Sequence, residues 1–85
     1  MSLEEKFKSA CDQARNFKKR PADGDVLELY GLYKQATVGD VNKAKPSDSE
    51  GAAKWNAWNS KKGLAAKYAK EQYIANVNTL APNHS

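Results

Sequence analysis

The sequence has few residues of the kinds that build disulfide, metal or catalytic centres. Its 85 residues include one cysteine, Cys11, and one histidine, His84. A disulfide framework within the chain and a cysteine-rich zinc site are excluded, because each needs several cysteines. One histidine cannot form a metal cluster of histidines, and we expect no catalytic triad. We interpret Cys11 as a small buried apolar residue.

Long apolar runs and phosphate loops are also missing. No stretch approaches 18 consecutive apolar residues, so the sequence predicts no transmembrane helix and no stable membrane insertion. The first residues, MSLEEKFK, lack the apolar core of a signal peptide, which favours a reducing, cytoplasmic setting. No glycine-rich loop of the dinucleotide or P-loop type is present. The acidic residues are scattered, mostly at expected helix starts, where they interact favourably with the helix dipole. We therefore expect neither enzymatic activity nor a cofactor.

The size of the chain limits where a ligand can bind. Its 85 residues and 9.4 kDa suit one domain, spanning residues 1–85. A domain this small buries only about 60–65% of its unfolded surface, so its core is thin. A ligand of any size should lie in a surface groove or between helices. The polar exterior offers no self-complementary apolar stripe, and we expect a monomer.

Caps and apolar spacing predict a first helix that ends before Pro21. Ser2 and Glu5 form a capping box, in which each side chain binds a free backbone N–H at the helix start. Apolar residues then recur at spacings of three and four on one face: Leu3, Phe7, Ala10, Ala14 and Phe17.

A second helix is expected to begin at Asp23 or Asp25, each a plausible cap, and to end at Gly39 in a left-handed conformation. It has two apolar faces, one with Val26, Tyr30, Tyr33 and Thr37 and another with Leu29, Leu32 and Ala36. A helix with two such faces contacts more than one neighbour, or a neighbour and a ligand.

Residues 39 to 49, GDVNKAKPSDS, are typical of a loop. Ser47 and Glu50 then offer a second capping box for a third helix that ends at Gly63. A fourth helix is expected from about residue 64 to 80, without a polar cap at its start, and Pro82 should end it, leaving a loose tail. Four helices and no strands predict an all-α bundle.

Aromatic and basic residues gather at helical spacing. Tyr30, Tyr33 and Lys34 share a side of the second helix, because spacings of three and four return to one face. A tyrosine ring can stack on a flat base, and a lysine suits a phosphate. Lys54 beside Trp55 repeats this mixture. The alternative is that the tyrosines are half-buried core residues and the lysines are simply solvated.

A phosphate-rich partner with an aromatic group would fit these patches. Nucleic acid meets that description in general terms, so a basic helical nucleic-acid-binding module is one alternative. However, Arg15 and Arg20 are the only arginines, and the longest connection is too long for a helix-turn-helix. We therefore expect no nucleic-acid partner.

Two longer motifs resemble a known family. LYGLYKQATVGDVN (residues 29–42) and KWNAWNSKKGLA (residues 54–65) are similar to the signature stretches of the acyl-CoA-binding protein family, also called diazepam-binding inhibitor. RPAD, at residues 20–23, and Tyr73-Ile74 match the same family, and the resemblance covers essentially the whole chain. It implies an up-down-down-up four-helix bundle that binds medium- and long-chain fatty acyl-CoA without altering it, as a carrier and buffer of the acyl-CoA pool.

The resemblance also implies the binding residues. They are Arg15, Tyr30, Gly31, Leu32, Tyr33, Lys34, Lys54 and Tyr73. Tyr30, Tyr33 and Lys34 match positions that hold the adenine and the 3′-phosphate, and Lys54 matches a second phosphate contact. Tyr73 matches a tyrosine that closes over the nucleotide end, and Arg15 replaces a lysine near the head group. Of the two tryptophans, we expect Trp55 to serve packing and Trp58 to lie nearer the ligand.

The resemblance leaves some properties open. Ser47-Asp48-Ser49 replaces a more apolar stretch after Pro46, and the loop is about two residues shorter than is usual in the family. Loops near this point border the acyl groove, so the preferred chain length is open. The family also includes receptor-modulating peptides that are secreted or processed, which is a further alternative. Enzymes that use acyl-CoA are possible partners.

Overall fold

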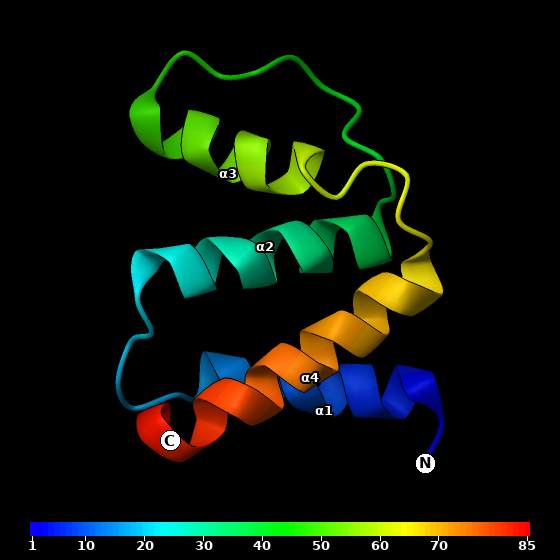
Figure 1. The fold of residues 1–85 in the computed structure, drawn as a ribbon, viewed down its shortest axis with the longest axis vertical. Helices are drawn as coiled ribbons and strands as arrows, with labels where there is room; N and C mark the ends of the chain where they lie inside the picture. Colours follow the sequence, from blue (N-terminus) through cyan, green and yellow to red (C-terminus); the bar gives the residue numbers. More distant parts are fainter.

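The computed structural model describes residues 1–85, which form four α-helices. The helices are α1 (Leu3–Arg15), α2 (Asp23–Thr37), α3 (Ser49–Asn59) and α4 (Ala66–His84). Followed along the chain, α1 and α4 run in one direction and α2 and α3 in the other (Figure 1). The expected up-down-down-up, all-α architecture is thereby confirmed. No helix is both long enough and apolar enough to cross a membrane.

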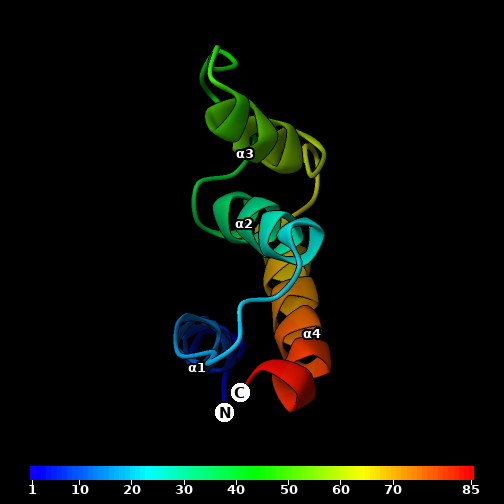
Figure 2. The same cartoon turned by 90° about the vertical axis from the view of Figure 1, so that its left-hand side faces the viewer.

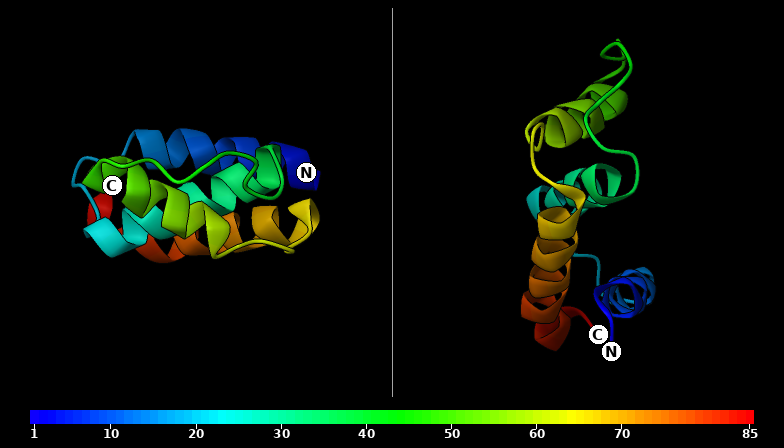
Figure 3. Two further views of the ribbon diagram at one scale, coloured as in Figure 1. Left: turned by 90° about the horizontal axis from the view of Figure 1, so that it is seen from above. Right: turned by 90° about the vertical axis from the view of Figure 1, so that its right-hand side faces the viewer.

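α2 lies in the middle of the molecule. It packs against α3 on one side and against α4 on the other, while α1 packs against α4 (Figure 2). The backbones of α1 and α2 do not pack against each other. The result is a thin molecule with extents of 35 × 28 × 15 Å (Figure 3). α2 therefore uses both of its apolar faces, one against α3 and the other against α4.

Side chains from α1, α2 and α4 form the core. Its buried members are Phe7, Ala10, Cys11, Leu29, Leu32, Ala36, Ala69, Tyr73 and Val77. Leu32 has no exposed surface, and burial of such a side chain contributes about 1.5–3 kcal/mol. Cys11 is buried among them, as the sequence predicts.

α3 approaches α2 closely at Gly31. A Cβ atom at this position would lie 2.4 Å from the carbonyl oxygen of Ala57, so only glycine fits. Trp58 fills the contact beside it with 2% of its surface exposed. Its indole N–H donates to the carbonyl oxygen of Gly39 at 2.7 Å. Gly39 has φ +98°, as expected for the left-handed end of α2.

The predicted capping box of α1 is confirmed, whereas that of α3 is wrong. The backbone N–H of Glu5 donates to Ser2 Oγ, and that of Ser2 donates to Glu5 Oε1, both at 3.1 Å. At α3 the cap is Asp48, whose carboxylate accepts from the N–H of Gly51 at 2.7 Å. An Asx cap at residue 48 leaves Ser47 outside the helix.

The start of α2 also differs from the expectation. Ala22 occupies the cap position without a side-chain hydrogen bond, and Asp23 and Asp25 lie in the first turn of the helix. Carboxylates there still favour the helix through its dipole. α4 begins after Ala65, also without a side-chain cap, as predicted.

α1 ends before Pro21, as expected, but earlier than its apolar stripe to Phe17 predicts, and the expected end of α4 at Pro82 is wrong. α1 ends at Arg15, six residues before Pro21. α4 continues through Pro82 to His84. The N–H of Lys19, which a longer α1 would use internally, donates to the carbonyl oxygen of His84 at 3.0 Å. A proline near the end of a helix removes only one hydrogen bond. This hydrogen bond joins the segment after α1 to the last turn of α4.

Candidate functional site

Two lysines lie over aromatic rings where α2 meets α3. The ammonium group of Lys34, on α2, is 4.9 Å from the centre of the Trp58 ring on α3. The ammonium group of Lys54, on α3, is 5.8 Å from the centre of the Tyr30 ring on α2. Each helix thus places a cation on an aromatic side chain of the other, a contact worth about 0.5–1 kcal/mol at exposed sites. These contacts hold one positive charge over Tyr30 and another over Trp58.

A cleft lies on the other side of α2, toward α1. Its volume is about 360 Å³, and its lining residues are Glu4, Glu5, Phe7, Lys8, Cys11, Arg15, Tyr33 and Thr37. Tyr33 is 39% exposed, and its ring stacks on that of Phe7 with the ring centres 6.0 Å apart and the planes at 24°. The cleft therefore offers a flat aromatic surface to a planar ligand.

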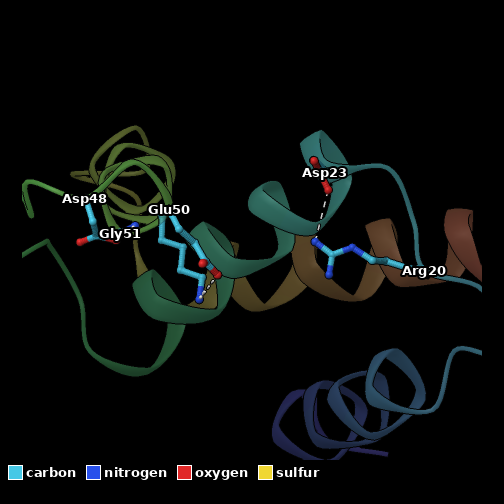
Figure 4. Close-up of polar contacts among 6 residues, drawn as sticks. Arg20, Asp23, Asp48, Glu50 and Gly51 are labelled. Carbon is cyan, nitrogen blue, oxygen red and sulfur yellow. Dashed lines mark hydrogen bonds and ion pairs between the residues drawn. The ribbon is translucent and has the colours of Figure 1, made fainter.

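A second hollow, which we call the α2–α3 groove, has a volume of about 300 Å³. Val26, Leu27 and Ala53 give it apolar walls, and its charged lining residues are Arg20, Asp23, Glu50 and Lys54. Figure 4 shows Arg20 on the segment that leads into α2, Asp23 at the beginning of α2 and Glu50 at the beginning of α3. The charged residues form ion pairs, Arg20 with Asp23 at 3.2 Å and Lys54 with Glu50 at 3.7 Å. The groove can therefore bury an apolar chain below a polar rim.

Lys54 links the two kinds of surface. Its ammonium group lies over Tyr30, and the same side chain borders the α2–α3 groove. A molecule with anionic groups near Lys34 and Lys54 could therefore place an aromatic part on Tyr33 and an apolar part along Val26. The arrangement suits an amphipathic anion, and it offers no group placed for catalysis.

Three of the residues expected in the site lie beneath its surface. Leu32 is fully buried, Gly31 faces the backbone of α3, and Tyr73 is 6% exposed. The Tyr73 ring packs edge-on against Phe7, with centres 5.2 Å apart, and lies 6.3 Å from the Tyr33 ring. In this structure Tyr73 supports Tyr33 and Phe7 from behind.

The titratable groups behind the cleft are neutral. Burial raises the pKa of the Tyr73 hydroxyl, and the nearby Cys11 thiol raises it further. Burial also raises the pKa of the Cys11 thiol. Both groups therefore stay protonated near neutral pH, and Cys11 is a poor nucleophile.

Arg15 borders the cleft from α1 and lies in solvent. It forms an ion pair with Asp12 one turn earlier, and this partner raises the pKa of the guanidinium group. An ion pair between two exposed side chains contributes little to stability. Arg15 is therefore free to exchange Asp12 for an anion in the cleft.

Both tryptophans serve packing, and neither lines the cleft or the α2–α3 groove. Trp58 lies beside an expected phosphate contact, since the Lys34 ammonium group is over its ring. Trp58 is the buried one, and Trp55 is half-buried, with its indole N–H donating to the carbonyl oxygen of Lys43 at 2.8 Å. Both side chains bind the loop that precedes α3. The burial of Trp58 follows from the close approach at Gly31, which spacing within α3 does not reveal.

Sequence reasoning did not assign several lining residues to the site. Apolar spacing assigns Phe7 to the core stripe of the first helix, and no sequence pattern marks Arg20, Leu27 or Ala53 as lining residues. One signal was available for the groove, because Val26 lies on the same predicted face as Tyr30 and Tyr33. The other lining residues become neighbours only through the packing of α2 on α3.

A family model described as "Acyl CoA binding protein" matches residues 4–77. The chain belongs to the acyl-CoA-binding protein family. Members of this family are non-enzymatic binding proteins. Across 85 residues, the chain is 41% identical to an acyl-CoA-binding protein homolog of Drosophila melanogaster, covering 98% of this chain and 99% of that protein.

A further relative and a solved structure agree with this assignment. An acyl-CoA-binding protein homolog of Manduca sexta is 47% identical over 83 residues, which cover 94% of this chain and 92% of the relative. The crystal structure of acyl-CoA-binding protein 2 of Oryza sativa superposes with a TM-score of 0.90 at 35% identity, covering 95% of this chain and 92% of that one. The family and the four-helix fold predicted from the two signature stretches are thus confirmed.

Proposed function

We propose that this protein is a carrier and buffer of medium- and long-chain fatty acyl-CoA in the cytoplasm. Acyl-CoA binding follows from membership in the family. The single domain, residues 1–85, binds one ligand as a monomer and releases it unchanged. One observation carries the proposal: Lys54 borders an apolar groove, and its ammonium group lies over the half-buried ring of Tyr30.

The nucleotide end of the ligand lies over α2. Lys34 and Lys54 bind phosphate groups, for which an ammonium group is a suitable point charge. The exposed ring of Tyr33 stacks on the adenine, and the Tyr30 hydroxyl donates to a phosphate. Arg15 reaches the head group from α1.

Three of the expected site residues position the others instead of contacting the ligand themselves. Gly31 sets the spacing of α2 and α3, which decides the width of the groove. Leu32 anchors α2 in the core, so that Tyr33 and Lys34 face outward. Tyr73 supports the ring of Tyr33 from α4.

The acyl chain lies in the α2–α3 groove. Burial of each methylene contributes about 0.8 kcal/mol, so a long chain supplies most of the binding energy. The lysines fix the orientation and select against free fatty acid, which has no phosphate groups. The protein therefore distinguishes acyl-CoA both from CoA and from the acid.

Calorimetry with dodecanoyl-CoA, CoA and dodecanoate tests this proposal. We expect tight one-to-one binding of dodecanoyl-CoA and weak binding of the other two. Equal affinity for CoA and its ester would contradict it. Salt-sensitive retention on DNA that dodecanoyl-CoA does not displace would favour a nucleic-acid-binding module instead.

A further inference from the structure

The cleft on the α1 side of α2 carries charges of both signs. Lys8 and Arg15 line it with cations, whereas Glu4 and Glu5 line it with carboxylates. The proposed function places the anionic nucleotide end of acyl-CoA at this cleft, because the exposed ring of Tyr33 is one of its walls. Unpaired carboxylates here would repel the phosphate groups of the ligand. Binding therefore depends on what neutralises them.

Each of the two carboxylates has a partner within the protein. Glu5 belongs to the capping box of α1 and accepts a hydrogen bond from the backbone N–H of Ser2 at 3.1 Å. Glu4 instead forms an ion pair with Lys70 of α4. This second partner comes from the far end of the chain and reaches Glu4 because α1 packs against α4.

Lys70 lies beside the cleft and is not one of its lining residues. Its side chain is 16% exposed, whereas that of Glu4 is 71% exposed. The ammonium group of Lys70 is also 5.9 Å from the centre of the Phe7 ring, and Phe7 lines the cleft. A ring and a carboxylate thus hold this cation next to the site, where a ligand in the cleft feels its charge without contacting it.

We propose that Lys70 is a specificity-determining residue of the nucleotide site, which neutralises Glu4 so that the cleft accepts a ligand with phosphate groups. The inference rests on the proposed function, since it places the nucleotide end of acyl-CoA in this cleft. Lys70 acts through Glu4 and the electrostatic field of the cleft, and Lys34 and Lys54 remain the direct phosphate contacts.

This electrostatic role differs from that of a simple tie between α1 and α4. Glu4→Gln and Lys70→Met break the same ion pair with little change of side-chain volume. A simple tie would make both variants bind acyl-CoA more weakly. If Lys70 neutralises Glu4, the two effects have opposite signs. Lys70→Met leaves a carboxylate without its counter-charge and weakens binding, whereas Glu4→Gln leaves a cation without its counter-charge and strengthens binding.

The test is calorimetry with dodecanoyl-CoA on the unaltered protein, the two single variants and the double variant. At low salt, one charge beside an anionic ligand should change Kd by about threefold to tenfold. We expect Kd to rise by this factor in Lys70→Met, to fall by it in Glu4→Gln, and to return to the original value in the double variant. In about 1 M salt, where the Debye length is about 3 Å, the differences should shrink to less than about twofold.

The matched control is Glu71→Gln, which changes the net charge of the protein by the same amount as Glu4→Gln. Glu71 is exposed on α4 and does not line the cleft. Its affinity for dodecanoyl-CoA should equal that of the unaltered protein. A gain as large as that of Glu4→Gln would show that the net charge, and not the pairing beside the cleft, sets the affinity, and would overturn the inference.

Weaker or unchanged binding in Glu4→Gln also overturns the inference but leaves the proposed function intact. This outcome decides even if Lys70→Met does not fold, because Glu4 is an exposed residue whose replacement leaves the core unaltered. Failure of the unaltered protein to bind dodecanoyl-CoA more tightly than CoA overturns the proposed function, and this inference with it.

Discussion

The ammonium group of Lys34 lies 4.9 Å from the centre of the Trp58 ring, so a cation on α2 rests on an aromatic side chain of α3. The Trp58 ring is in turn held by the hydrogen bond from its indole N–H to Gly39. Trp58 on α3 and Gly39 at the end of α2 therefore both help to hold the Lys34 ammonium group in place. A phosphate-binding lysine that is already held in place loses less conformational entropy when a ligand arrives.

Replacement of Lys34 by alanine should weaken acyl-CoA binding. The loss of a charge-assisted hydrogen bond costs about 1.5–3 kcal/mol, or about tenfold to a hundredfold in Kd. Stability should change by about 0.5–1 kcal/mol, the value of an exposed cation–π contact. Titration calorimetry and urea denaturation measure the two effects.

Lys67→Ala is the control for this variant. It removes a lysine that lies over Tyr68 on α4 and should leave affinity unchanged. Equal affinity in both variants would remove Lys34 from the site.

Tyr33→Ala should also weaken binding, because it removes the exposed ring on which the adenine stacks. Stacking of a base on an aromatic side chain is worth about 1–3 kcal/mol. Tyr33→Phe keeps the ring and should retain most of the affinity. Tyr68→Ala is a matched control, since Tyr68 is 55% exposed and lies on α4 outside the cleft. A Tyr33→Phe variant as weak as Tyr33→Ala would show that the hydroxyl, and not the ring, is the binding group.

Two glycines of α2 should respond to alanine in opposite ways. At Gly31 a Cβ atom would lie 2.4 Å from the Ala57 carbonyl oxygen, so Gly31→Ala must push α3 away and should destabilise the fold by about 1–3 kcal/mol. At Gly24 nothing lies within 4 Å, and Gly24→Ala should stabilise it by about 0.5–1 kcal/mol through helix propensity. The urea midpoints of the two variants measure both changes. A neutral Gly31→Ala would mean that α3 is not held closely against α2.

Asp40 should make the stability of the fold sensitive to acid. Its carboxylate accepts hydrogen bonds from the N–H of Gly63 and the side chain of Gln35, both at 2.8 Å, which lower the pKa below its ordinary value of 3.8. Between the lowered pKa and 3.8 the unfolded chain binds the proton more readily, so stability falls as the pH falls through this interval.

The Asp40→Asn variant should lack this part of the acid sensitivity. Its urea midpoint should be lower at neutral pH and should change less when the solution is acidified. Denaturation series at several pH values check the prediction. The same pH dependence in both proteins would assign the acid sensitivity to other carboxyl groups, such as Glu5, whose pKa is lowered by its hydrogen bonds with Ser2.

Features set by a few neighbouring residues could be predicted from the sequence. The Ser2–Glu5 capping box and the left-handed Gly39 depend on backbone geometry within one turn. Gly63 does not end α3 as expected, because the helix already ends at Asn59. The outward positions of Tyr33 and Lys34 follow from helical spacing, since Leu32, which directly precedes them, lies in the core. The family followed from the order of residues in two signature stretches.

Features that depend on distant segments could not be predicted. The end of α1 and the passage of α4 through Pro82 both involve the hydrogen bond between Lys19 and His84, which are far apart in the sequence. The choice of Trp58 over Trp55 for burial depends on how α3 is rotated against α2. Ala53 lines the α2–α3 groove because of the same rotation of α3 against α2.

The hydrogen bond between Lys19 and His84 joins the last turn of α4 to the segment just before Arg20, which lines the α2–α3 groove. The end of α4 thus helps to hold Arg20 in place, although residues 82–85 do not line the groove. A substitution that displaces the backbone of His84 should therefore loosen the segment before Arg20 without contacting the ligand.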